Sequence, residues 1–160
     1  ISHIVAMCGF VSVSDMVDTF FSGILSGYRR AVKELESSSN PDYYDYNAAN
    51  TLSNSSVKAM LVYSDNDHLC KKSHYDLLKT RLSGRENVKF LLESGKGHNP
   101  NYTKNAIKLL AEFTAKRAKL LKKKDLTNEE KKVFVASFDW EKITEQDDAV
   151  WNQIFAHLNA

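Results

Sequence analysis

Two apolar runs, separated by a short helical segment, constrain the fold of this chain more than any other feature. Val57–Tyr63 is almost continuously apolar, as expected of a strand covered on both faces, and Val88–Leu92 repeats this character. Between them, Ser73 and Asp76 fit a capping box that opens a helix, and Gly84 is placed to end it. A strand, a helix and a strand in this order predict a right-handed parallel crossover unit.

The segments before this unit extend the pattern to a mixed α/β protein. Ile4–Cys8 is another short apolar run and predicts a further buried strand. Apolar residues recur every three or four positions over 14–35, with Ser14 placed as the cap, which predicts one long amphipathic helix. Residues 36–54 are rich in Ser, Asn and Tyr and predict loops or short helical turns. We therefore expect a short parallel sheet of about three strands with a helical insertion.

The last third of the chain predicts helices. An amphipathic pattern begins near Thr103, and Thr127 and Glu130 fit the capping box of a later helix. The basic stretch 116–124 has the composition of a nucleic-acid or anionic-lipid contact. However, 22 Lys and Arg against 20 Asp and Glu leave a formal charge of only +2, so we expect a solvated helix end and no nucleic-acid partner.

Composition excludes several other classes of protein. With 42% hydrophobic residues the chain can bury a core, and no apolar run approaches the roughly 18 residues of a membrane span, so we expect no membrane partner. Cys8 and Cys70 are too few for a disulfide framework, and no signal peptide is visible. We therefore expect free thiols and a cytoplasmic protein.

Candidate chemistry lies where the last two expected strands end. Asp67 follows one strand and His98 follows the next, so a parallel sheet should bring them together at one edge. A carboxylate beside an imidazole fixes its tautomer while the other ring nitrogen takes a proton from a nucleophile. We therefore expect a carboxylate oxygen and a ring nitrogen within about 4 Å of each other. Asp65 is the alternative acid, because a shift of two residues would exchange the two carboxylates.

These two loops resemble the acid loop and the histidine loop of the α/β-hydrolase family. Residues 57–70 look like the family's acid strand and the loop after it, with Ser64 where Gly is usual and Leu69–Cys70 in place of Val-Pro. Glu93–Pro100 looks like the loop that delivers the catalytic His, with small residues before it. The resemblance covers about residues 1–118 and implies that Asp67 and His98 belong to a Ser-His-Asp triad.

Family topology also implies where the nucleophile lies. In α/β hydrolases it precedes these strands on a Gly-x-Ser-x-Gly turn. This chain has no such string, and the nearest, Gly23–Gly27, falls inside the expected long helix. We therefore expect 1–118 to be the C-terminal half of a hydrolase domain, with a cap over about 11–54 and a helical tail over 119–160. The nucleophile half would precede Ile1. We expect the edge of the first strand to be covered by that half, by a second copy through swapping, or by rearranged helices.

The implied function is that of a serine hydrolase of esterase, lipase, thioesterase or peptidase type. Its substrate would be a small-molecule ester, thioester or amide, it would need no cofactor, and this fragment alone would be inactive. The alternative is a non-catalytic interaction module that keeps half of the hydrolase fold and binds a partner through its exposed sheet edge or its last helices.

Other side chains with reactive or ligating groups have less support from their surroundings in the sequence. His68 and His74 could bind a metal with Asp67, but no further ligand stands at a defined spacing, so we expect no metal site and two exposed histidines. Cys8 lacks the cationic surroundings that activate a thiol, which favours a buried free cysteine. Six aromatic residues fit an acyl pocket and ordinary cap packing equally well: Phe20, Phe21, Tyr28, Tyr43, Tyr44 and Tyr46.

Overall fold

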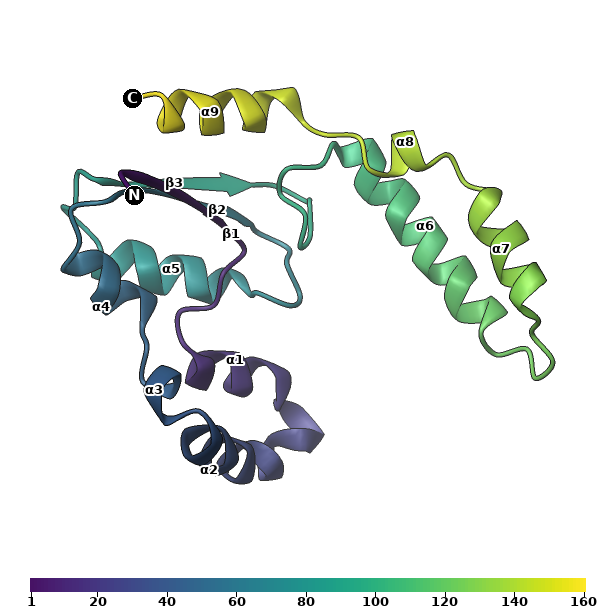
Figure 1. Cartoon of the computed structure of the whole chain (residues 1–160), viewed down its shortest axis with the longest axis horizontal. Helices are drawn as coiled ribbons and strands as arrows, with labels where there is room; N and C mark the ends of the chain where they lie inside the picture. The colour runs from purple at the N-terminus through teal and green to yellow at the C-terminus, as the bar shows by residue number, and fades with distance from the viewer. The chain divides into compact units, whose positions relative to one another are not determined.

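The computed structural model describes residues 1–160 and has the mixed α/β architecture that the sequence predicts (Figure 1). Its one sheet has three parallel strands in the order β1, β2, β3, with Ile4 opposite Ala59 and Leu61 opposite Phe90. The strands are β1 His3–Met7, β2 Lys58–Ser64 and β3 Val88–Glu93. The prediction of a short parallel sheet is confirmed.

Helices occupy the rest of the regular structure. None of them combines the length and the apolar character that crossing a bilayer requires. They are α1 Val13–Phe20, the 3-10 helix η1 Gly23–Tyr28, α2 Arg29–Ser39, α3 Pro41–Tyr44, α4 Ala48–Ser53, α5 Lys72–Arg81, α6 Lys104–Leu120, α7 Asn128–Ala136, α8 Trp140–Ile143 and α9 Asp148–Leu158.

The chain forms two compact units. The first contains residues 1–100 and 153–160, and the second contains residues 101–152. The break therefore falls after Pro100, whereas the sequence suggests a boundary after residue 118. The reason is that the apolar side of α6 packs inside the second unit, where Phe113 contacts the rings of Phe134, Phe138 and Trp140.

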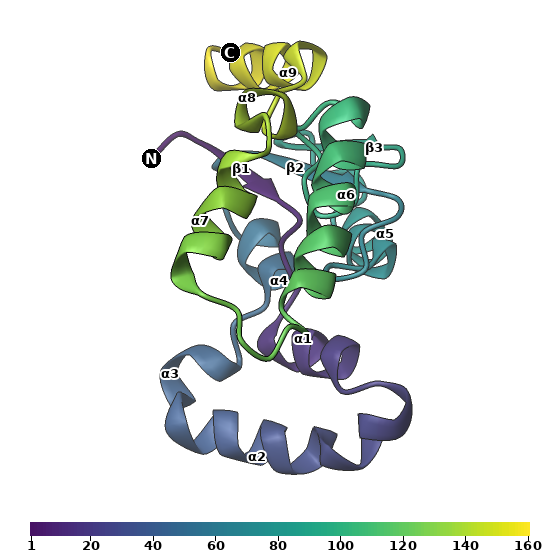
Figure 2. The ribbon, with the colours of Figure 1, turned by 90° about the vertical axis from the view of Figure 1, so that its right-hand side faces the viewer.

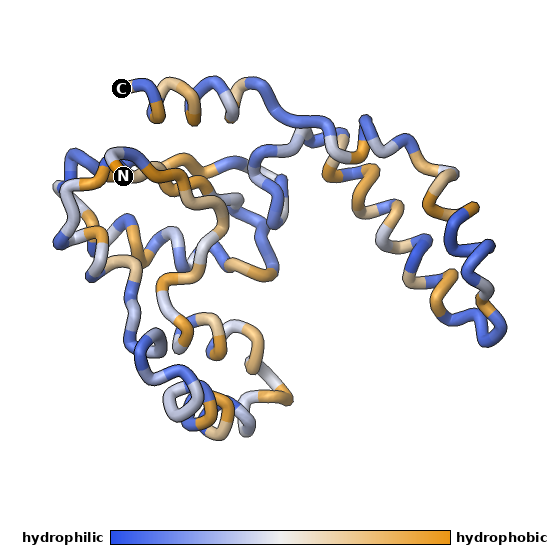
Figure 3. The backbone as a smooth tube through the Cα atoms, in the orientation of Figure 1, coloured by the Kyte–Doolittle hydropathy of each residue, from blue (hydrophilic) through white to orange (hydrophobic).

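The core of the first unit lies on one face of the sheet. Alternate residues of β2 point to this face, because side chains of a strand alternate, and they pack against α4 and α5. Figure 1 shows both helices on this side, and Figure 3 shows the apolar character of the strands that they cover. The buried cluster includes Leu52, Ala59, Leu61, Tyr63, Tyr75, Leu78 and Leu82.

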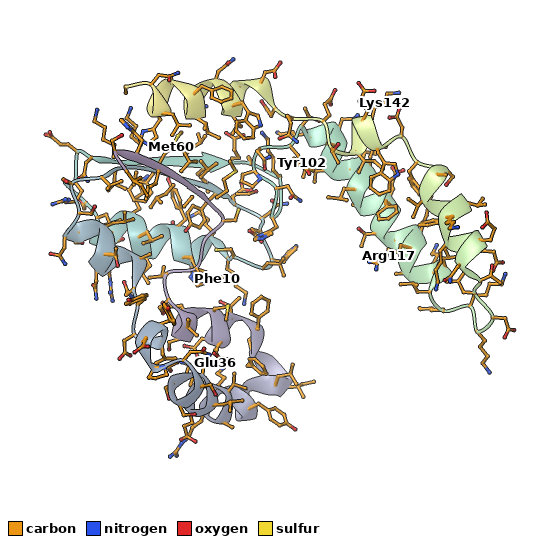
Figure 4. All side chains as sticks on the ribbon, viewed as in Figure 1. Phe10, Glu36, Met60, Tyr102, Arg117 and Lys142 are labelled. Atoms are coloured by element: carbon orange, nitrogen blue, oxygen red, sulfur yellow. The ribbon has the colours of Figure 1, made fainter.

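The last residues of the chain cover the opposite face. Met60 and Ile154 are buried, and Figure 4 shows Met60 on the side of the sheet where α9 lies. His157 Nε2 lies 3.2 Å from the carbonyl oxygens of Ile4 and Lys58. Residues 153–160 thus belong to the first unit, although the sequence predicts them as part of the tail.

The single long helix expected over 14–35 is wrong. The structure divides this segment into α1, η1 and the start of α2. Gly23 has a φ of 61°, outside the right-handed helical region, so one continuous α-helix cannot pass through it and the apolar periodicity continues across a break between α1 and η1. The cap is Ser12, whose Oγ accepts a hydrogen bond from the Asp15 amide at 3.1 Å. In Figure 2, α2 lies beyond α1 and α3 from the sheet, and it buries no residue.

Of the capping boxes expected at 73–76 and 127–130, the second forms. Thr127 and Glu130 make both reciprocal hydrogen bonds at the start of α7. The box at Ser73 and Asp76 is wrong because α5 begins at Lys72 without a side-chain cap, and Asp76 pairs instead with the Lys72 ammonium at 2.6 Å.

Candidate active site

Asp67 and His98 meet at the carboxyl end of the sheet. Ser64 at the end of β2 lies opposite Glu93 at the end of β3, and this register places the two following loops side by side. His98 Nδ1 lies 2.7 Å from Asp67 Oδ2. The Asp67 side chain is fully buried, whereas 44% of the His98 side chain is exposed. The distance meets the geometric expectation from the sequence.

The backbone of its own loop holds the Asp67 carboxylate in place. Oδ1 accepts hydrogen bonds from the amides of Leu69 at 2.8 Å and Cys70 at 3.0 Å, which leaves Oδ2 directed at His98. Burial alone raises the pKa of Asp67. The hydrogen bonds from His98, from these two amides and from the Cys8 thiol outweigh burial, so the pKa falls below its usual value. The carboxylate is therefore ionised at neutral pH.

Three consecutive side chains of the acid loop hold the backbone of the histidine loop. Each accepts a hydrogen bond from an amide just before His98, and Gly95 and Gly97 supply the positive φ values, 75° and 57°, that this path needs. The pairs are Asp65 Oδ1 with the Gly95 amide at 2.8 Å, Ser64 Oγ with the Lys96 amide at 3.1 Å, and Asn66 Oδ1 with the Gly97 amide at 2.7 Å.

Asp65 is thus a positioning residue in this structure. Its carboxylate accepts hydrogen bonds from the Gly95 amide and from Ser94 Oγ, at 2.8 and 2.9 Å. The imidazole of His98 instead contacts Asp67. Between the two acids that the sequence offers, the geometry favours Asp67. The cluster of polar residues after β2 is the sequence signal for this loop-to-loop support, since such side chains commonly bind neighbouring backbone amides.

Lys96 connects the histidine loop to the end of β3, a role that the sequence does not indicate. Only 2% of its side chain is exposed, and its ammonium lies 2.9 Å from Glu93 Oε2 at the end of β3. A buried charge is tolerated only with a partner, so this ion pair ties the loop to the strand. In sequence Lys96 looks like an ordinary loop lysine.

Cys8 completes the surroundings of Asp67. It follows β1, is 5% exposed, and is a free thiol, as the sequence predicts. Burial, and then the hydrogen bond to Asp67 and its negative charge, raise the pKa of the Cys8 thiol far above its usual value. Cys70 is also buried, and burial together with the charge of Asp67 raises its pKa to about 12. Neither thiol is activated as a nucleophile.

The two other histidines near Asp67 in sequence do not join it. His74 was expected to be exposed, which is wrong, because it is buried with Nε2 3.1 Å from Thr19 Oγ1 and its ring against Phe10. Burial lowers the pKa of His74. His68 lies at the surface, as expected.

A hollow of about 510 Å³ lies beside β1, mostly lined by apolar side chains that include Ile4, Phe10 and Leu52. Of the six aromatic residues for which an acyl pocket and cap packing were equally open, Tyr46 lines this hollow. The hollow borders the edge strand, because β1 pairs with β2 alone.

No family model, curated protein or solved structure matches this chain, so its resemblance to α/β hydrolases stays a prediction.

Proposed function

We propose that this chain supplies the acid, Asp67, and the base, His98, of a Ser-His-Asp triad in a serine hydrolase whose nucleophile lies outside these 160 residues. The observation that carries the proposal is the 2.7 Å contact between a buried, ionised carboxylate and a half-exposed imidazole. Such a pair orients the ring and leaves its outer nitrogen available to a reacting group.

The pair would act by proton transfer. With Nδ1–H donated to Asp67, His98 Nε2 takes the proton of a serine hydroxyl as that oxygen attacks the substrate carbonyl. Asp67 then stabilises the imidazolium, and Nε2 returns the proton to the leaving group. These proton-transfer steps need no cofactor. It suits small esters, thioesters and amides, whose carbonyl carbons accept an oxygen nucleophile.

The free edge of β1 is where a segment that carries the nucleophile could join the sheet. An unpaired edge offers backbone donors and acceptors to another strand, and the adjacent apolar hollow offers a surface to a helix. The partner would be a preceding segment of the same protein or a second copy. Free, buried thiols fit a reducing compartment, so we expect the hydrolase to work in the cytoplasm.

The test is hydrolysis of small aryl esters by the product of the complete reading frame that encodes this chain. His98→Ala should lower kcat/KM by at least about 1,000-fold. His68→Ala is the matched control, because this exposed imidazole lies next to Asp67 in sequence and should leave the rate unchanged. Full activity of His98→Ala would refute the assignment. The 160-residue chain alone should show no turnover.

The alternative is a non-catalytic interaction module, and the unpaired edge of β1 is the observation that favours it. A module would bind its partner equally well with His98→Ala, and the complete gene product would hydrolyse no ester. The same assay therefore separates the two functions.

A further inference from the structure

Three different donor groups converge at the carboxyl end of the sheet. Cys8 follows β1, Asp67 follows β2, and His98 follows β3. The Cys8 sulfur, a carboxylate oxygen of Asp67 and a ring nitrogen of His98 all lie within 4.8 Å of one another. A thiolate, a carboxylate and an imidazole are the ligands that Zn²⁺ takes in proteins. The donor set thus suits a borderline-soft divalent cation better than Mg²⁺ or Ca²⁺, which prefer oxygen alone.

The spacing of the donors is close to that of a tetrahedral site. Zinc bonds of about 2.0 to 2.3 Å place neighbouring ligand atoms about 3.3 to 3.6 Å apart. Asp67 Oδ2 and His98 Nδ1 lie 2.7 Å apart, and no two of the three donor atoms are more than 4.8 Å apart. Movements of about 1 Å or less therefore bring all three donors onto one ion.

The surrounding structure directs two of these donors. Asp67 Oδ1 is held by the amides of Leu69 and Cys70, which leaves Oδ2 directed at His98. Backbone support of this kind is typical behind metal-binding carboxylates. It fixes the donor before the ion arrives.

Cys8 has a strained backbone that aims its side chain. Its φ of 49° is the only positive value at a non-glycine residue in the chain. This conformation costs about 1 to 2 kcal/mol, and such strain is concentrated at sites where the direction of a side chain matters. Here the strained residue holds its sulfur within 4.8 Å of a carboxylate oxygen of Asp67.

The site has one open side. Cys8 and Asp67 are buried, whereas 44% of the His98 side chain is exposed. An ion can therefore reach the donors past the imidazole, and a water molecule can fill the fourth position there, as in zinc sites that keep an open coordination position.

We propose that Cys8, Asp67 and His98 form a binding site for a divalent cation of the Zn²⁺ class, with water as the fourth ligand. On binding, the thiol proton leaves to the solvent, and bonds from the ion to Oδ2 and the ring nitrogen replace their mutual hydrogen bond. The site goes beyond the proposed hydrolase function and does not depend on it. If both hold, the ion occupies the acid and the base and blocks proton transfer.

The experiment is titration of the purified chain with Co²⁺ and then Zn²⁺, followed by absorption spectroscopy. One equivalent of Co²⁺ should produce the near-ultraviolet charge-transfer band of a thiolate ligand, and one equivalent of Zn²⁺ should remove it. Cys8→Ser should abolish the band and weaken Zn²⁺ binding at least about 100-fold. His98→Ala should weaken Zn²⁺ binding at least about 10-fold, whereas its matched control His68→Ala should bind as the wild type does.

Binding without a thiolate band, a band that survives in Cys8→Ser, or the absence of one-to-one binding would each overturn the proposal. Circular dichroism of each variant checks folding. If Cys8→Ser does not fold, the Zn²⁺ affinities of His98→Ala and His68→Ala are compared instead. Equal affinity in these two variants would also exclude the site. No substrate or nucleophile enters this experiment, so failure of the hydrolase proposal would leave its result unchanged.

Discussion

Replacing Asp67 by Ala should destabilise the first compact unit by about 3 kcal/mol at pH 7. The substitution removes the acceptor of the Leu69 and Cys70 amides, which bind Oδ1 at 2.8 and 3.0 Å. A hydrogen bond to a charged group contributes about 1.5 to 3 kcal/mol, and a buried donor left unpaired adds to the loss. The Cys70 amide is buried, whereas the Leu69 amide is only partly buried, so the loss lies near the lower end of the about 3 to 6 kcal/mol that two such bonds contribute.

The effect should depend on pH in a defined direction. The pKa of Asp67 in the folded chain lies below its ordinary value of 3.8. A carboxyl group with a lowered pKa stabilises the fold fully above its unfolded pKa, and the stabilisation is lost as pH falls through the folded pKa. The difference between the wild type and Asp67→Ala should therefore be constant from about pH 5 to 7 and shrink below about pH 4.

Native-state hydrogen exchange of peptides from β2 measures this loss in the first unit alone. About 3 kcal/mol corresponds to exchange roughly 100-fold faster through global opening. Asp76→Ala is the control, since its exposed ion pair with Lys72 contributes less than about 0.5 kcal/mol. A loss of stability below about 1 kcal/mol in Asp67→Ala, or a loss that is unchanged at pH 3, would show that the ionised Asp67 carboxylate does not stabilise the fold in this way.

Three further substitutions test the remaining supports. Glu93→Gln removes the carboxylate that lies 2.9 Å from the buried ammonium of Lys96 and should destabilise the first unit by about 3 kcal/mol, measured by hydrogen exchange of β3; no change would contradict the anchoring role. Tyr63→Phe removes a 2.6 Å hydrogen bond to the Gly9 carbonyl and should cost about 1 kcal/mol in β2 exchange, and a gain in stability would contradict it. Phe113→Ala opens the aromatic cluster of the second unit and should cost about 2 kcal/mol in urea unfolding followed by tryptophan fluorescence, with β2 exchange unchanged.

The sequence predicts the central pair because parallel topology leaves little choice. Two parallel strands end at the same edge, so Asp67 and His98 must lie near each other once both strands are assigned. The support that holds them is less predictable. Whether Asn66 accepts from Gly97 depends on the loop conformation, which the sequence limits only through its glycines.

Two errors have separate physical origins. The long helix was expected because apolar periodicity continues through Gly23, although the backbone there leaves the helical region. The docking of the last residues on the sheet has no local signal, since His157 contacts Ile4 from the other end of the chain. Contacts between distant segments depend on tertiary packing that a periodic pattern does not encode.

In the proposed triad, Asp67 fixes the tautomer of His98 so that Nε2 can act as a base. Nitrogen-15 NMR of the histidine ring in the purified chain measures this directly, at a pH where the ring is neutral. We predict a protonated Nδ1 and an unprotonated Nε2 in the wild type, with the preference lost in Asp67→Ala and kept in Asp76→Ala. A ring protonated at Nε2, or a tautomer that is unchanged when Asp67 is replaced, would contradict the account.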